Sequence, residues 1–170
     1  ILCTPTNRIR HKGDTLGGIN LTIRITAPMP EVIRVQTYHH MGIKKREPEF
    51  ELELPEQTFF DTEENDTDII VKSGHLSLII DKENWSMRYE RDGKLISQSG
   101  GRDLAYIKKD WKGAAYDKGG NAYMRQQLGL SVDELIYGLG EQFRPFVKNG
   151  QSISIWNEDG GTSTDQSYKN

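Results

Sequence analysis

The chain has 170 residues, a formal net charge of −3, 28% charged residues and only 35% hydrophobic residues, which suits a globular domain whose strands have one wetted face. Lysine and arginine are spread along the chain, and the one tight group, residues 44–46, is flanked by glutamates, so the charge pattern argues against a nucleic-acid partner. No apolar run approaches the ~20 residues of a membrane span and no signal-peptide pattern opens the chain, so we expect no membrane partner and a cytoplasmic location. Cys3 is the single cysteine, which excludes an internal disulfide, and a homo-oligomer is compatible with these features.

Short runs of alternating apolar and polar residues follow one another along the chain. This pattern is typical of half-buried strands. It predicts strands at residues 21–26, 32–38, 50–54, 69–71, 76–80, 85–90, 104–107 and 122–128. Asp92-Gly93 predicts a hairpin turn after one of them, and Trp85 and Tyr89 are interpreted as core anchors.

Two polar segments invite a metal hypothesis, and we interpret both otherwise. The acidic residues 61–68 lack the glycine and the terminal glutamate of a calcium loop, so they are read as a solvated connection. His39 and His40 are neighbours in a predicted strand, where adjacent side chains face opposite sides and cannot share one ion. We therefore expect no metal and no other cofactor.

Apolar residues never recur at helical spacing over three turns, although Ser131 to Glu134 could open a single helical turn. About ten short strands separated by turn residues predict an all-β protein, an antiparallel β-sandwich that occupies residues 1–170 as one domain.

The most informative segment is residues 137–170, which is dense in glycine. Residues 151–156 alternate and predict a strand that leads into Asn157-Glu158-Asp159-Gly160-Gly161 and then into Thr162-Ser163-Thr164. A carboxylate, an amide and hydroxyls beside Trp156 are the polar groups and the apolar surface that a sugar-binding site uses. An Asp-Gly pair after a strand suits a plain hairpin turn equally well, and the hydroxyls suit turn caps.

Several strings resemble the N-terminal domain of glycoside hydrolase family 31, and within it the bacterial α-xylosidases. They are Tyr137-Gly138-Leu139-Gly140-Glu141, Val147-Lys148-Asn149-Gly150-Gln151, Trp156-Asn157, Asp159-Gly160-Gly161-Thr162-Ser163-Thr164 and Tyr168-Lys169-Asn170, preceded by Pro28 to Val35, His39-His40-Met41-Gly42 and Lys72 to Leu76. The resemblance implies a galactose-mutarotase-like supersandwich at the N-terminus of a larger glycosidase.

The same resemblance implies retaining hydrolysis of α-xylosidic or α-glucosidic bonds in oligosaccharides by two aspartates on a (β/α)8 barrel that follows the sandwich. We therefore expect this chain to be a fragment without a catalytic residue of its own, with that C-terminal barrel as its partner. The family's sandwich lends a loop to the sugar site, and this loop maps onto residues 156–164. Asp159 would accept hydrogen bonds from sugar hydroxyls, with Asn157, Thr162 and the backbone at Gly160 in support. Trp156 would stack on a sugar ring or pack beneath the loop.

The residues alone define no catalytic constellation. The carboxyl candidates Glu141, Glu158, Asp159 and Asp165 have no setting that separates an acid from a nucleophile, and no nucleophile elbow or phosphate loop occurs. A free-standing carbohydrate-binding module is the alternative reading. A mutarotase-like isomerase is disfavoured because no His/Glu acid–base pair can be placed.

Overall fold

The computed structural model describes residues 2–3, 10–12, 21–39, 60–109, 121–140 and 144–155. In these residues the chain forms ten strands and no α-helix, and every strand pairing is antiparallel. The chain divides into two compact units, Ile1–Gly129 and Leu130–Asn170, and all ten strands belong to the first. The predicted all-β antiparallel class is confirmed, whereas a single domain over residues 1–170 stays a prediction.

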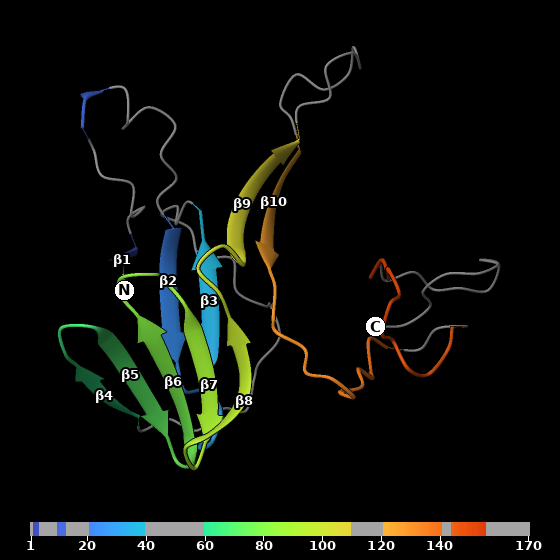
Figure 1. Ribbon diagram of the computed structural model, residues 1–170, viewed down its shortest axis with the longest axis horizontal. Coiled ribbons are helices and arrows are strands. Elements are labelled where there is room, and N and C mark those ends of the chain that lie inside the picture. The colour runs from blue at the N-terminus through green and yellow to red at the C-terminus, as the bar shows by residue number, and fades with distance from the viewer. Residues whose placement is uncertain are drawn as a thin grey trace. The chain divides into compact units, whose positions relative to one another are not determined.

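The strands of the first unit form three sheets (Figure 1). The three-stranded sheet has the order β1 (Leu2–Cys3), β2 (Leu21–Thr26) and β3 (Arg34–Tyr38). The five-stranded sheet is a meander of β4 (Asp61–Glu64), β5 (Asp68–Ser73), β6 (Leu76–Asp81), β7 (Met87–Arg91) and β8 (Lys94–Ser99). A separate hairpin pairs β9 (Leu104–Lys109) with β10 (Asn121–Gln126).

The hydrophobic core lies between the first two sheets. Alternate residues of β5 to β7 are buried because successive side chains of a strand point to opposite faces. The buried cluster is Val71, Leu78, Ile80 and Met87, and the half-buried side chains packed against it are Ile25, Ile33, Val35, Ile69, Trp85 and Tyr89. Because β2 and β3 supply part of this shell, the two sheets form a sandwich. The interpretation of Trp85 and Tyr89 as core anchors is confirmed.

The hairpin between β7 and β8 has the turn that its Asp-Gly pair predicts. Arg91 pairs with Lys94, so Asp92 and Gly93 form a two-residue loop. Both have positive φ, 50° at Asp92 and 75° at Gly93, as the turn that matches the twist of paired strands requires. This local signal correctly places the last two strands of the meander.

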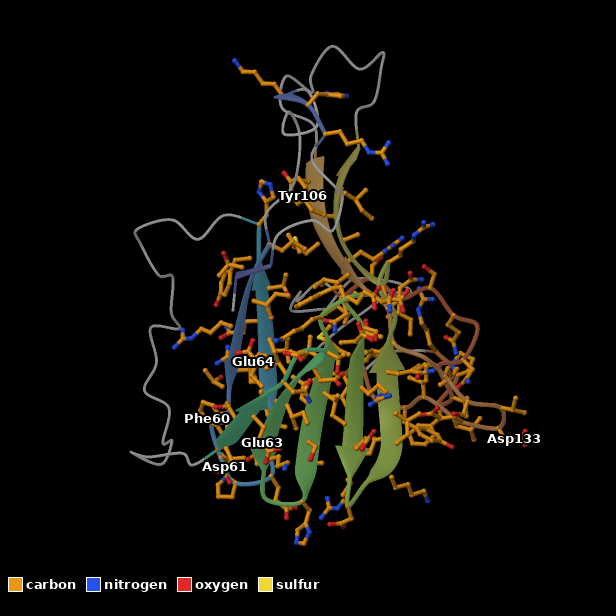
Figure 2. The ribbon with its side chains drawn as sticks, turned by 60° about the vertical axis from the view of Figure 1, so that its left-hand side comes forward. Phe60, Asp61, Glu63, Glu64, Tyr106 and Asp133 are labelled. Carbon is orange, nitrogen blue, oxygen red and sulfur yellow. The ribbon has the colours of Figure 1, made fainter. Side chains whose placement is uncertain are left out.

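The acidic residues 61–68 are not simply a connection, so that interpretation was wrong for their first half. Residues 61–64 form β4, which pairs only with β5 among the described residues and lies at the edge of the sheet (Figure 2). Lys72 Nζ lies 2.6 Å from Glu63 Oε1, and Lys82 Nζ lies 2.7 Å from Glu64 Oε1. Charged side chains suit an exposed edge strand because they discourage pairing with another chain.

Candidate functional site

The residues predicted to contact sugar lie outside the described residues. They are Asp159, Asn157, Trp156, Gly160 and Thr162, and the other carboxyl candidates, Glu141, Glu158 and Asp165, lie outside them too. In the second unit the structure describes residues 130–140 and 144–155, the last of which lead into this loop.

The side chain of Asn149 joins two segments of the second unit. Its amide nitrogen donates to the carbonyl oxygen of Glu134 over 2.9 Å, and its oxygen accepts from the backbone N–H of Ile136 over 2.8 Å. The N–H of Lys148 donates to the carbonyl oxygen of Ile136 over 2.8 Å. An amide side chain has one donor group and one acceptor, so Asn149 can satisfy two backbone groups as a neighbouring strand would. These bonds fix the base of the segment that leads toward residue 156.

Residues 131–134 form a reverse turn, so the helical turn predicted there was wrong. The N–H of Ser131 donates to the carboxylate of Glu134 over 2.8 Å, and the N–H of Glu134 donates to the carbonyl oxygen of Ser131 over 3.2 Å. Asp133, at the outer tip of the turn in Figure 2, has a φ of 67°, which no right-handed helix accommodates. The hydroxyl and acidic residues that suggested a helix start stabilise this turn instead.

Three successive residues of the Tyr137-Gly138-Leu139-Gly140 string have left-handed backbone. Their φ angles are 99° at Gly138, 68° at Leu139 and 77° at Gly140. A Cβ added at Gly138 would meet nothing within 4 Å, so within this chain the glycine serves the backbone conformation. Leu139 carries the strain of a non-glycine residue in this region. The described part of the string, residues 137–140, is thus a turn of the backbone.

The strand predicted at residues 151–156 is not formed in its described part, residues 151–155. Gln151 instead continues a tight turn, because its N–H donates to the carbonyl oxygen of Lys148 over 3.1 Å. The Arg144 guanidinium donates to the carbonyl oxygen of Ser152 over 3.3 Å. Alternation predicts which faces a segment would present, but a strand also needs a neighbour for its ladder, and the described residues supply none here.

The first unit has an apolar cavity of about 420 Å³ at one side of the sandwich. Strands β3 and β8, each at an edge of its sheet among the described residues, both contribute to its wall, together with β6, β7, β10 and the chain after β10. Its apolar lining comes from Ile33, Val35, Leu76, Ile96 and Leu128. The same wall also carries polar residues, which are Ser77, Tyr89, Glu90, Ser97 and Gln126.

Tyr89 lines that cavity and is partly buried there. Burial raises the pKa of its phenol above the ordinary value, while the hydrogen bond with Gln126 acts in the opposite direction. The phenol is therefore a neutral hydrogen-bonding group at ordinary pH. The sequence pattern could not bring Gln126 to Tyr89, since no periodicity relates residues from β7 and β10.

An ionic cluster connects the β2–β3 loop to turns of the five-stranded sheet. Glu31 lies 2.9 Å from the Arg91 guanidinium and 3.7 Å from His75 Nε2. His75 Nδ1 lies 2.6 Å from Asp92 Oδ1. All four side chains are substantially exposed, so each pair adds little to stability and chiefly orients the turns.

The described residues include no group of three or more His, Cys, Asp or Glu arranged to hold a metal ion. The ring of His39 stacks on Tyr106 with centroids 3.8 Å apart and planes 7° apart, while His40 lies outside the described residues. Within the same described part, no helix has the length and apolar character to cross a bilayer.

Comparison with known proteins identifies the family of this domain. The chain belongs to the family described as the glycosyl hydrolase 31 N-terminal galactose mutarotase-like domain, whose profile matches residues 22–170. This match confirms the resemblance found in the strings around residues 137–170, and residues 156–164 lie inside the matched range.

Two curated relatives extend the match over nearly the whole chain. Alpha-xylosidase XylQ of Lactiplantibacillus pentosus is 38% identical over 169 residues, which cover 98% of this chain and 21% of that protein. An alpha-xylosidase of Emericella nidulans is 36% identical over 174 residues, which cover 95% of this chain and 22% of that protein. The chain therefore spans about a fifth of the length of these relatives.

Proposed function

We propose that this chain is the N-terminal accessory domain of a retaining α-glycosidase that acts on α-xylosidic or α-glucosidic bonds of oligosaccharides. The observation that carries the proposal is the match of two proteins named as alpha-xylosidases along 95% and 98% of the chain. Because the chain corresponds to only 21% and 22% of their lengths, the proposal places the catalytic carboxylates on a separate (β/α)8 domain of the same polypeptide.

The proposed role of this domain is to supply residues 156–164 to the sugar site. Asp159 accepts hydrogen bonds from sugar hydroxyls, and such charge-assisted bonds are strong and sensitive to geometry. Asn157, Thr162 and the Gly160 backbone add further polar contacts, and Trp156 supplies an apolar surface at the base of the loop. The bonds made by Asn149 support this role, because they anchor the chain a few residues before the loop.

The first test compares the 170-residue chain with the full polypeptide encoded in its reading frame. Only the full polypeptide is expected to release nitrophenol from aryl α-xylosides or α-glucosides. In it, Asp159→Ala should lower kcat/KM by roughly 10- to 150-fold, the equivalent of ~1.5–3 kcal/mol for a lost charged hydrogen bond.

Asp66→Ala is the matched control, because Asp66 is an exposed acid in the turn between β4 and β5. Its kcat/KM should equal that of the unsubstituted enzyme. Equal kinetics for Asp159→Ala and Asp66→Ala would remove the loop from the sugar site.

A free-standing carbohydrate-binding module is the second candidate, and one observation favours it. The strands of the first unit enclose a hydrophobic core of their own, as a module that folds independently requires. Calorimetry of the isolated chain with xyloglucan oligosaccharides separates the two candidates. Measurable affinity supports the module, and the accessory-domain proposal predicts none.

A further inference from the structure

The second unit presents large apolar side chains to solvent along one short stretch of chain. We infer that this surface is where the domain docks onto the later, catalytic part of its own polypeptide. The inference rests on the proposed function and adds to it the place of contact. The residues of this apolar surface are Leu130, Val132, Leu135, Tyr137, Leu139 and Phe146, with exposed fractions from 41% at Leu139 to 91% at Val132.

Several polar side chains of the same stretch are bonded to its own backbone. The Glu134 carboxylate accepts from Ser131 N–H, and Lys148, only 8% exposed, donates from Nζ to the carbonyl oxygen of Pro145 over 2.8 Å. With Asn149 also bonded on both sides, charged and amide groups are satisfied internally while apolar groups face out. An ordinary solvated loop has the opposite arrangement, so this one is built for a dry contact.

The second unit also lacks a hydrophobic core of its own in the part that the structure describes. Not one described apolar side chain of residues 130–155 is buried, and Lys148 is the one buried residue among them. Tyr137 and Phe146 do contact each other, with centroids 5.1 Å apart and planes tilted by 48°, but Phe146 remains 78% exposed. Pieces of about 40 residues need outside support to stay folded, so we expect a partner to cover this surface.

The length of the relatives identifies the partner. About four fifths of each curated relative lies outside the part that this chain matches, so the parent proposed above carries a much larger domain on the same polypeptide. A tethered domain is present at a high effective concentration and needs only a modest contact to stay docked. Aliphatic and aromatic side chains with little charge are the composition of such interface centres.

The test is thiol labelling at position 132. Val132 is the most exposed of these residues, so the substitution Val132→Cys removes no packing in the isolated chain. The matched control is Asp66→Cys in the β4–β5 turn of the sandwich. Both variants are made in the 170-residue chain and in the full polypeptide, and label from a neutral maleimide is quantified by peptide mass spectrometry. The thiol introduced at position 132 should react at least about tenfold more slowly in the full polypeptide, since burial makes reaction depend on opening. The thiol introduced at position 66 should react equally in both proteins.

Three results would overturn the inference or separate it from the proposed function. Equal labelling of the Val132→Cys variant in both proteins shows that no downstream domain covers the surface. Protection of position 132 that appears in the isolated chain as its concentration rises, together with a dimer mass, assigns the surface to a second copy. Protection of position 132 in a full polypeptide that cleaves no α-glycoside keeps the docking surface and rejects the glycosidase proposal.

Discussion

Large apolar side chains are buried in the core of the sandwich and exposed in the second unit. Leu78 and Ile80 of β6 are fully buried, whereas Val132 and Phe146 are 91% and 78% exposed. The strands of the sandwich satisfy their backbone through ladders, while residues 134–149 use the side chain of Asn149 for part of the same purpose. Hydrogen bonds therefore define the backbone in a region whose described residues form no hydrophobic core.

This difference assigns different physical roles to the two regions. The sandwich carries the apolar burial that stabilises folding, because its core cluster draws on both main sheets. Residues 130–155 add hydrogen bonds but little burial, so we expect their local stability to depend on what covers them.

The largest expected effect comes from deleting core volume. Leu78→Ala in the 170-residue chain should lower the free energy of unfolding by about 2–5 kcal/mol, because it leaves a cavity among Val71, Ile80 and Met87. Val132→Ala should change it by less than about 0.5 kcal/mol. Urea titrations followed by circular dichroism measure both, and similar losses for the two variants would break the distinction between the regions.

A smaller, local effect is expected from the bridging amide. Asn149→Ala should speed hydrogen exchange of the Ile136 amide by roughly 2- to 12-fold, since an ordinary hydrogen bond contributes about 0.5–1.5 kcal/mol, and leave amides of β6 unchanged. Asn65→Ala is the counterpart in the sandwich. Its oxygen accepts from the N–H groups of Thr67 and Asp68 over 2.9 and 2.7 Å, so exchange should rise in the β4–β5 turn instead. If Asn149→Ala accelerates exchange across the sandwich, the two units are not independent.

The smallest effect is expected at the charged edge of the sandwich. Lys72→Met removes the 2.6 Å contact with Glu63, whose side chain is 60% exposed, so unfolding free energy should fall by only ~0–1 kcal/mol. The difference from the unsubstituted chain should vanish in about 1 M salt, where charges are screened within roughly 3 Å. A difference that persists in high salt would mean that the lysine acts through packing of its alkyl stem.

Most of the sandwich could be predicted because its signals are local. Alternation located β2, β3, β6 and β7, the apolar run at residues 69–71 located β5, and the Asp92-Gly93 pair located the turn between β7 and β8. Strand β4 was missed because four consecutive polar residues show no alternation, and only pairing with β5 makes them a strand.

The candidate site was predictable in its motif and not in its geometry. The strings around residues 137–170 led to the correct family, yet Asp159 and its neighbours lie outside the described residues, so their role in sugar binding stays a prediction. The turn at residues 131–134 was mistaken for a helix start because Ser131 and Glu134 suit both, and the positive φ of Asp133 decides between them. The paired hydrogen bonds of Asn149 have no sequence signal, since they depend on two segments being brought together.

Hydrogen exchange of the isolated chain and of the full polypeptide tests most directly whether residues 130–155 form an interface while the sandwich folds by itself. Peptides from β6 should exchange equally slowly in both proteins, and peptides covering residues 130–139 should be protected only in the full polypeptide. Equal protection of residues 130–139 in the two proteins, or loss of protection in β6 when the chain is isolated, would contradict this account.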